Sequence, residues 1–295
     1  MTATILERLA RGELIVSDGA TGSFLQAKGL GDGDPEEWNA SHPEVVQGMA
    51  KAYFDAGSQM VLTNTFGGTR LRQSHYGFEN RAAEFNRLAA EHARSQAPDG
   101  CFVVGSVGPT GEVLNDPLRD NPLTEAQAYD AFAEQITALA DGGVDAVNIE
   151  TMIDINEATI AVRAAKENTD LTVMSTMFFD KGPRGFFTMM GTPPPEAVSK
   201  LHEAGADIVG ANCGNGIDVM LELARELRAA TDGYLLIHSN AGIPAPIGGE
   251  IVYPESPEFM ADRFKVMAQD VGVNILGGCC GTTPDHIRAL VNAVR

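Results

Sequence analysis

Three of the four cysteines in this sequence stand at the ends of hydrophobic runs that are typical of buried strands. Cys213 closes the stretch AGADIVGANC, and the adjacent Cys279 and Cys280 close VGVNILGGCC. Adjacent cysteines bond to each other only with strain, so the pair favours thiolate chemistry in a reducing compartment over a disulfide framework. Cys101 lies within another predicted strand, and we interpret it as a core residue.

Three thiolates that meet at one point form a donor set for Zn²⁺, which takes sulfur ligands at about 2.3 Å. Three protein ligands leave one position open, which is typical of a catalytic rather than a structural zinc site. A substrate thiol in that position would lose its proton and stay nucleophilic at neutral pH. The spacing matches no zinc finger, so an alternative stays open. The cysteines could be small buried hydrophobes, with the GGCCGTT loop packing tightly or binding a phosphate.

The elements that must position these residues follow a repeated pattern. Four times a helix-like stretch ends at a glycine that caps it, and a hydrophobic run without alternation follows at once. Such a run is typical of a strand buried on both faces. With four further runs of this type, the predicted strands are 13–19, 56–65, 101–108, 142–151, 171–178, 204–213, 234–242 and 271–280.

Amphipathic stretches between the strands predict helices, for example over residues 123–143 and 194–205. Thr124 and Gln127 form a predicted capping box at the start of the first of these. Alternating strands and helices predict a parallel sheet, and eight such units predict a (β/α)8 TIM barrel. Because no linker or change of composition interrupts the chain, we expect a single domain over residues 1–295.

In a barrel of this kind, catalytic groups come from the carboxyl ends of the strands. Asp18 and Glu150 could hold the amino group of an amino-acid substrate there, or they could form structural salt bridges. His238 could be a zinc ligand, a group that orients a ligand, or a core histidine, and we favour the last two. The polar residues at the predicted strand ends are Asp18, Asn64, Thr65, Ser106, Glu150, Thr151, Cys213, His238, Asn240, Cys279 and Cys280.

The composition argues against several other classes of protein. A formal net charge of −19 disfavours a nucleic acid or an anionic membrane as the partner. The first residues lack the apolar region of a signal peptide, and no apolar run of about 18 residues could cross a bilayer. We therefore expect a cytoplasmic protein that acts on small molecules. The sequence does not indicate the oligomeric state.

Eight motifs along the chain occur together in one known family. They are DGATGSFL (18–25), EEWN (36–39), LTNTFGGTR (62–70), GSVGPTGE (105–112), NIET (148–151), GANCGNG (210–216), HSNAGIP (238–244) and GGCCGTTPDHI (277–287). In this order they resemble the homocysteine S-methyltransferase family, from about residue 13 to the C-terminus. The pair GANCG and GGCCGTTP is highly specific. The resemblance implies a zinc-bearing barrel enzyme that transfers a methyl group to homocysteine, forming methionine.

The resemblance also implies roles for individual residues. Cys213, Cys279 and Cys280 would hold the zinc, and the homocysteine sulfur would take the fourth position. Asn240 matches an asparagine that occupies this position when substrate is absent. Transfer would be a direct in-line displacement without a separate acid or base. The residues that match the homocysteine-binding side are Asp18, Gly19, Glu150 and Thr151.

The sequence indicates the methyl donor less specifically than the methyl acceptor. We favour a small onium compound such as glycine betaine, because a quaternary cation binds well to aromatic faces. Trp38, Phe66 and Tyr76 are the donor-side candidates. Gly67 stands where animal betaine enzymes of the family carry a tyrosine, so a close copy of their donor site is not expected.

Several alternatives for the donor and the reaction remain. The family also includes enzymes that use S-methylmethionine, and the homocysteine module of cobalamin-dependent methionine synthase. The methyl group could therefore come from a separate methylcobalamin-carrying corrinoid protein or from a methylfolate system. A zinc-dependent hydrolase with Glu150 as the base is a further alternative. Three thiolates would weaken the Lewis acidity of the metal, however, which favours thiol alkylation.

Overall fold

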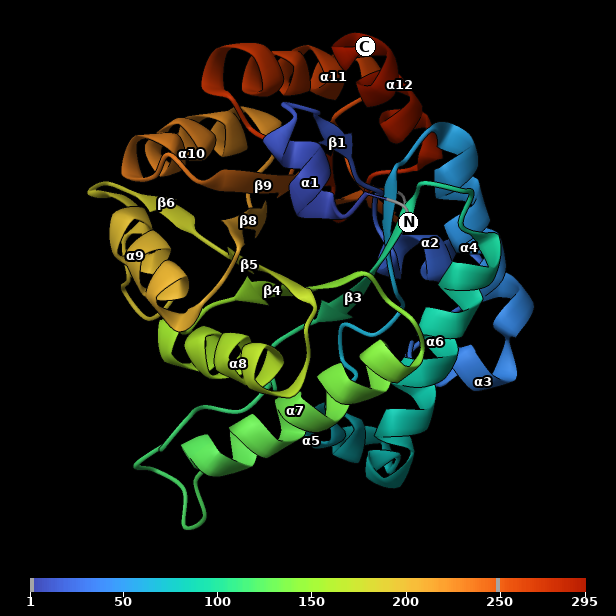
Figure 1. Ribbon diagram of the computed structural model, residues 1–295, viewed down its shortest axis with the longest axis vertical. Helices are drawn as coiled ribbons and strands as arrows, with labels where there is room; N and C mark the ends of the chain where they lie inside the picture. Colours follow the sequence, from blue (N-terminus) through green and yellow to red (C-terminus); the bar gives the residue numbers. More distant parts are fainter. Residues whose placement is uncertain (1–2, 248–249) are drawn as a thin grey trace.

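The structure is a computed structural model that describes residues 3–247 and 250–295. Eight parallel strands form a ring, which Figure 1 shows along its axis. Around the ring they are β1 (Ile15–Val16), β12 (Ile275–Gly278), β9 (Tyr234–Ser239), β8 (Ile208–Cys213), β5 (Thr172–Met177), β4 (Ala146–Met152), β3 (Phe102–Val107) and β2 (Met60–Leu62). This order follows the chain, and the predicted (β/α)8 TIM barrel is confirmed.

The ring closes between β1 and β2 through a few contacts rather than a full ladder. The Gln59 N–H donates to the Val16 carbonyl at 2.7 Å, and the Gln59 side-chain oxygen accepts from the Val16 N–H at 3.2 Å. A few residues further along the two strands, the Leu62 N–H donates to the Asp18 carboxylate at 2.7 Å. The contacts that close the barrel therefore also fix the side chain of Asp18, a predicted substrate-binding residue.

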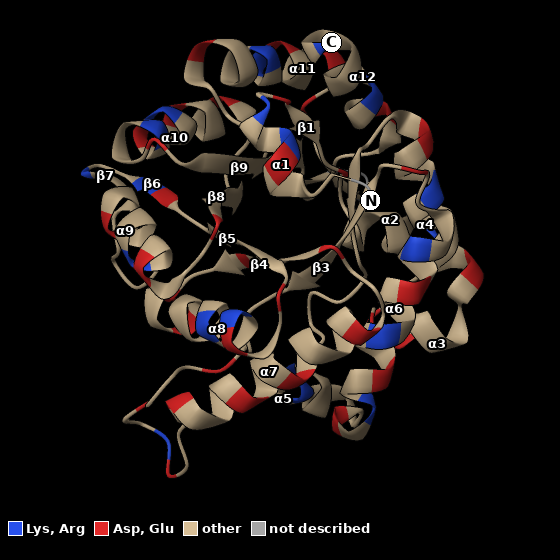
Figure 2. Ribbon diagram, in the orientation of Figure 1, with Lys and Arg blue, Asp and Glu red and all other residues tan. Residues whose placement is uncertain are grey.

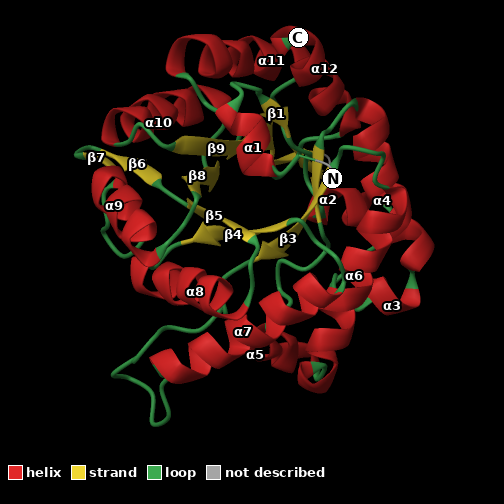
Figure 3. Ribbon diagram, viewed as in Figure 1, coloured by secondary structure: helices red, strands yellow, loops and turns green. Residues whose placement is uncertain are grey.

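Helices surround the strands, as Figure 3 shows. The longer ones are α4 (Pro43–Ala56), α6 (Ala82–Gln96), α7 (Glu125–Asp141), α8 (Ile155–Asn168), α9 (Pro194–Ala204), α10 (Ile217–Ala230), α11 (Pro257–Val266) and α12 (Pro284–Val294). The capping box predicted at Thr124 and Gln127 is present and begins α7. Charged residues lie mainly on the outer helices and in the loops (Figure 2). Within the described residues, no helix is long and apolar enough to cross a bilayer.

The amino end of the barrel is covered by α1 (Ile5–Ala10), a helix that the sequence analysis did not predict. Its residues Ile5 and Leu9 are buried, and the Arg8 guanidinium lies over the ring of Phe102 at 5.4 Å. The apolar cluster inside the barrel consists of Ile5, Leu9, Ile15, Met60, Leu62, Phe102, Val104, Ala146, Met174, Ile208, Leu236 and Ile275. The ring is therefore filled with side chains from its amino end upwards.

The loops at the carboxyl end carry short elements that the sequence analysis also missed. Two antiparallel hairpins follow β5 and β9. These elements are α2 (Gly22–Ala27), α3 (Trp38–Ser41), α5 (Arg70–Gln73), β6 (Asp180–Gly182), β7 (Gly185–Phe187), β10 (Ala245–Ile247) and β11 (Glu250–Val252). The loops after β1 and β2 are long, and they cover the end of the barrel where the strand-end residues gather.

Candidate active site

The three cysteines meet at the carboxyl end of the barrel. Cys213 is the last residue of β8, while Cys279 and Cys280 follow β12, and β9 lies between these two strands. All three are free thiols, and their sulfur atoms lie within 4.8 Å of one another. Cys101 precedes β3 at the other end of the barrel, half-buried against the core. The structure thus brings together the three cysteines singled out by the sequence and leaves the fourth apart.

The turn after β12 requires glycine. A β-carbon on Gly278 would lie 2.2 Å from the Thr282 hydroxyl oxygen, so a larger residue would push this side chain away. Thr282 in turn donates to the Cys279 carbonyl at 2.7 Å and accepts from the Ala20 N–H at 3.1 Å. The Cys279 N–H donates to the Ser239 carbonyl at 2.7 Å. These contacts fix the cysteine pair relative to β9 and to the loop after β1.

Asn212, which the sequence analysis did not single out, connects the ends of β4 and β8. Its side-chain oxygen accepts from the Thr151 N–H and the Thr176 hydroxyl, both at 2.7 Å. Its amide donates to the Thr151 hydroxyl at 2.7 Å and lies 3.9 Å from the Cys279 sulfur. The signal for it was its place beside Cys213 in GANCG.

Two residues at these strand ends adopt a backbone conformation that is rare for residues other than glycine. Thr151 has a φ of 59° and Cys213 a φ of 68°, both in the left-handed region. Such strain is found mainly at functional sites, where surrounding contacts stabilise it. For Thr151 these contacts are the hydrogen bonds to Asn212.

The electrostatics of the cluster favour a bound cation. Hydrogen bonds from the Cys279 and Cys280 thiols lower the pKa of Cys213 to about 3. The same bonds raise the pKa of Cys280 to about 11, and they raise that of Cys279 well above its ordinary value. Without a cation, the Cys213 thiolate therefore accepts hydrogen bonds from the thiols of Cys279 and Cys280. A bound metal would allow all three cysteines to ionise.

Asn240 supplies a further oxygen near the cluster. Its amide donates to the Gly214 carbonyl at 2.8 Å and contributes to the lowered pKa of Cys213. Its side-chain oxygen is buried and has no hydrogen-bond partner among the described residues. The three sulfurs fit a zinc ion, which is bound by cysteine thiolates and takes four ligands, so one position is left for a further donor.

Asp18 and Glu150 are both buried beside the cluster. Asp18 accepts from the Leu62 N–H at 2.7 Å and from the Ser17 hydroxyl at 3.1 Å. Glu150 accepts a hydrogen bond from the Ser106 hydroxyl. Burial raises the pKa of each carboxyl group to about 7, because the charged form loses its hydration. A substrate ammonium group between them would restore the charged form.

One cavity of about 390 Å³ joins these groups. Trp38, a predicted donor-side residue, does not line it; its ring stacks on His42 with 4.4 Å between the ring centroids. Asn240 is buried and is not among the lining residues. His238 lines the cavity, and one of its buried ring nitrogens has no partner among the described residues. The predicted site residues that line the cavity are Asp18, Gly19, Phe66, Tyr76, Glu150, Thr151, Cys213, Cys279 and Cys280.

Further residues line the cavity that the sequence analysis did not assign. Glu36 accepts from the Gly67 N–H at 2.6 Å, and the Gln73 amide donates to Asp34 at 3.1 Å. Tyr253, which lies between β9 and β12 in the sequence, packs against Gly281 in the turn after β12. The EEWN motif pointed to the region of Glu36, but nothing in the sequence indicated which side chains face the cavity. The unassigned lining residues with charged or aromatic side chains are Asp34, Glu36, Arg72 and Tyr253.

The fold and the site together define an α/β-barrel enzyme with a thiol-rich metal site at the carboxyl ends of its strands. Comparison with known proteins is consistent with this class: the chain belongs to the homocysteine S-methyltransferase family, whose profile matches residues 15–294. The resemblance seen in the sequence is thereby confirmed, and with it the class of enzyme.

Solved structures show the same fold. The metallated form of the homocysteine methyltransferase MmuM from Escherichia coli is 22% identical with a TM-score of 0.79, covering 97% of this chain and 99% of that chain. Its oxidized form is 23% identical with a TM-score of 0.78, covering 98% and 99%. Type I 3-dehydroquinate dehydratase from Clostridium difficile is 11% identical with a TM-score of 0.53, covering 95% and 91%. At these identities the likeness concerns the fold.

Proposed function

We propose that this enzyme uses zinc to transfer a methyl group from a small onium donor, such as glycine betaine, to the sulfur of homocysteine. The observation that carries the proposal is that three cysteine sulfurs and two buried carboxyl groups share one cavity. A thiol-bearing amino acid is the substrate that suits both sets of groups, and the family membership supports the same acceptor.

The zinc would be held by Cys213, Cys279 and Cys280, with the Asn240 oxygen available when no substrate is bound. When present, the metal keeps the sulfur of homocysteine in its nucleophilic thiolate form at neutral pH. The hydrogen bond from the Cys279 N–H to the Ser239 carbonyl would help to fix the position of this sulfur donor.

The other end of homocysteine would be bound by Asp18 and Glu150. Their carboxylates would receive hydrogen bonds from the substrate ammonium group, and the Ser106 hydroxyl would orient Glu150. Gly19 and Thr151 line the cavity beside these two residues. With both ends held, the sulfur lone pair would face the remaining space of the cavity, where the donor would enter.

The onium donor would bind at the mouth of the cavity. Phe66 and Tyr76 line the cavity, and each residue is 42% exposed, so a cation could rest against their rings. The methyl carbon would then be attacked in line by sulfur while its bond to the donor nitrogen breaks. No proton is transferred at that carbon, so the protein contributes alignment and exclusion of water rather than an acid or base.

A donor panel tests the proposal. Zinc-loaded protein and homocysteine are supplied separately with glycine betaine, S-methylmethionine or methylcobalamin, and methionine is quantified. We expect turnover with an onium donor, and glycine betaine should be the better of the two. Turnover with methylcobalamin alone would overturn the onium proposal and point to a corrinoid partner. Absence of homocysteine binding would overturn the proposal altogether.

A further inference from the structure

The cavity is strongly acidic, yet one cation lines it. Asp18, Asp34, Glu36, Glu150 and the three cysteines face the cavity, and Arg72 is the only lysine or arginine that lines it within the described residues. Arg72 lies on α5 in the loop after β2, half-buried at the mouth. A guanidinium in such a position calls for a partner, because its partial burial costs hydration.

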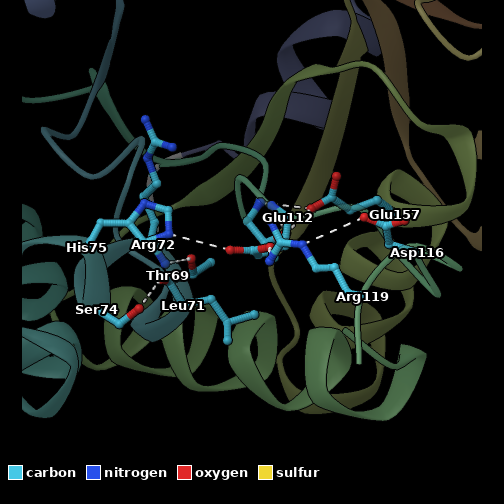
Figure 4. A network of polar contacts seen from close by, with 10 residues as sticks. Thr69, Leu71, Arg72, Ser74, His75, Glu112, Asp116, Arg119 and Glu157 are labelled. Carbon is cyan, nitrogen blue, oxygen red and sulfur yellow. Dashed lines mark hydrogen bonds and ion pairs between the residues drawn. The ribbon is translucent and has the colours of Figure 1, made fainter. Parts of the chain in front are cut away.

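Arg72 has no such partner in the part of the chain that the structure describes. Within residues 3–247 and 250–295, its guanidinium takes part in no ion pair or hydrogen bond, although Arg70 on the same short helix pairs with Glu134. Figure 4 shows the Arg72 side chain pointing away from the neighbouring pair formed by His75 and Glu112. The guanidinium is thus available for a ligand in the cavity.

Asp34 and Glu36 line the same cavity, but among the described residues neither forms an ion pair with Arg72, and both accept hydrogen bonds from other groups. Glu36 accepts from the Gly67 N–H at 2.6 Å, and Asp34 accepts from Gln73 at 3.1 Å. Burial and the neighbouring Asp34 raise the pKa of Glu36 to about 8, so this carboxyl group is mostly neutral at pH 7. In this neutral form Glu36 does not form an ion pair with the Arg72 guanidinium.

The lack of a side chain at two glycines leaves space for Arg72. A β-carbon on Gly67, the residue after Phe66, would lie 3.2 Å from the Arg72 Cγ and from the Glu36 carboxylate oxygens. A β-carbon on Gly111 would lie 2.8 Å from the Arg72 Nη1 atom. The loops after β2 and β3 thus leave a slot for this side chain next to the aromatic residue Phe66, which lines the same cavity.

We propose that Arg72 binds the carboxylate of the methyl donor, so that the site selects zwitterionic onium carboxylates over simple onium cations. The inference rests on the proposed function, since it concerns the donor of that reaction. An arginine fork matches a carboxylate in a bidentate geometry, while the rings of Phe66 and Tyr76 suit the onium group. Glycine betaine carries these two groups one carbon apart.

The test compares two donors in zinc-loaded protein with homocysteine. Glycine betaine carries a carboxylate, whereas tetramethylammonium offers the same type of methyl group without one. For Arg72→Gln we expect kcat/KM with glycine betaine to fall by about 10- to 100-fold, mainly through KM, because a charge-assisted bond is lost. With tetramethylammonium kcat/KM should stay within about twofold. Arg72→Lys should lie between the wild type and Arg72→Gln.

Arg70→Gln is the matched control, because Arg70 is on the same helix but pairs with Glu134 outside the cavity. It should leave kcat/KM unchanged for both donors. Equal losses for both donors in Arg72→Gln, or no loss, would overturn the inference while the proposed function stands.

Binding provides a second readout that does not need turnover. Calorimetry follows glycine betaine binding to the zinc-loaded protein in the presence of L-homoserine, which replaces the thiol by a hydroxyl. Binding that weakens at least about tenfold in Arg72→Gln supports the inference independently of any rate measurement. Binding that is equal in both proteins, or absent from the wild type, contradicts it.

Discussion

At the scale of single residues, the site depends on groups that are kept in unfavourable states until ligands arrive. Three thiols share one negative charge, and two buried carboxyl groups have pKa values raised to about 7. Thr151 and Cys213 hold left-handed backbone conformations. The shared charge and the buried carboxyl groups cost stability that a cation in the cavity, whether a metal or an ammonium group, would offset. The backbone strain at Thr151 is stabilised instead by its hydrogen bonds to Asn212.

Cys279→Ala removes one sulfur from the cluster. We expect the variant to lose tightly bound zinc and at least about 100-fold in methionine formation, because two sulfurs do not replace three. Metal analysis of the purified protein and a turnover assay measure both effects. Cys101→Ala, at the other end of the barrel, is the control and should retain zinc and rate. A Cys279→Ala protein with full zinc and full rate would refute the metal site.

The raised pKa values of Asp18 and Glu150 predict a pH dependence of substrate binding. Below pH 7 both carboxyl groups are mostly neutral, and above it they ionise, whereas the ammonium group of an amino acid stays charged throughout. The affinity for methionine, which has no thiol to titrate, should therefore rise with pH through about 7. Calorimetry across this range checks it, and Asp18→Asn should reduce the rise. An affinity that does not change with pH would contradict the assignment.

At the scale of elements, the site is assembled by contacts between loops. Thr282 joins the turn after β12 to the loop after β1, and Asn212 joins the ends of β4 and β8. Glu36 joins the loop after β1 to the loop after β2 through the Gly67 N–H. Because these contacts span distant parts of the chain, a change in one loop should alter the position of groups in another.

Gly278→Ala tests this dependence. Its β-carbon would displace Thr282, so we expect a loss of about 1–3 kcal/mol in the free energy of unfolding together with weaker zinc binding. Chemical denaturation and metal titration measure the two effects. Gly22→Ala is the control, since a β-carbon there meets no atom within 4 Å, and its effect should stay within about 0.5 kcal/mol. Equal stability of the two variants would contradict the packing argument.

The boundaries of the elements show what could be predicted from the sequence. Buried parallel strands are continuous hydrophobic runs, so all eight were found. The first was predicted over 13–19, yet β1 covers only Ile15–Val16, because Asp18 bonds to the Leu62 N–H through its side chain. The hairpins after β5 and β9 lie in loops whose sequences do not alternate. Asn212 and Arg72 were missed because their importance arises from contacts between separate loops.

At the scale of the whole molecule, the residues that stabilise the fold and the residues of the candidate site lie at opposite ends of the barrel. The helix α1 and the inward-facing apolar side chains fill the amino end, while polar and sulfur-bearing groups occupy the carboxyl end. This division is general for barrels of this type. The net charge of −19 comes mainly from residues on the outer helices and loops, as Figure 2 shows.

Leu9→Ala tests this separation. Leu9 is 3% exposed in the apolar cluster at the amino end, so we expect the free energy of unfolding to fall by about 2–5 kcal/mol. The KM for homocysteine should not change at a temperature where the variant remains folded. Denaturant titration and steady-state kinetics provide the two values. A changed KM with unchanged stability would mean that the two ends of the barrel are not independent.

The central claim is that the three cysteines hold a zinc ion at which homocysteine binds through its sulfur. X-ray absorption at the zinc edge counts the sulfur neighbours of the metal directly. For the zinc-loaded protein we predict three sulfur neighbours and one oxygen or nitrogen neighbour, and four sulfur neighbours after homocysteine is added, at about 2.3 Å. A count that stays at three with saturating homocysteine would contradict the account.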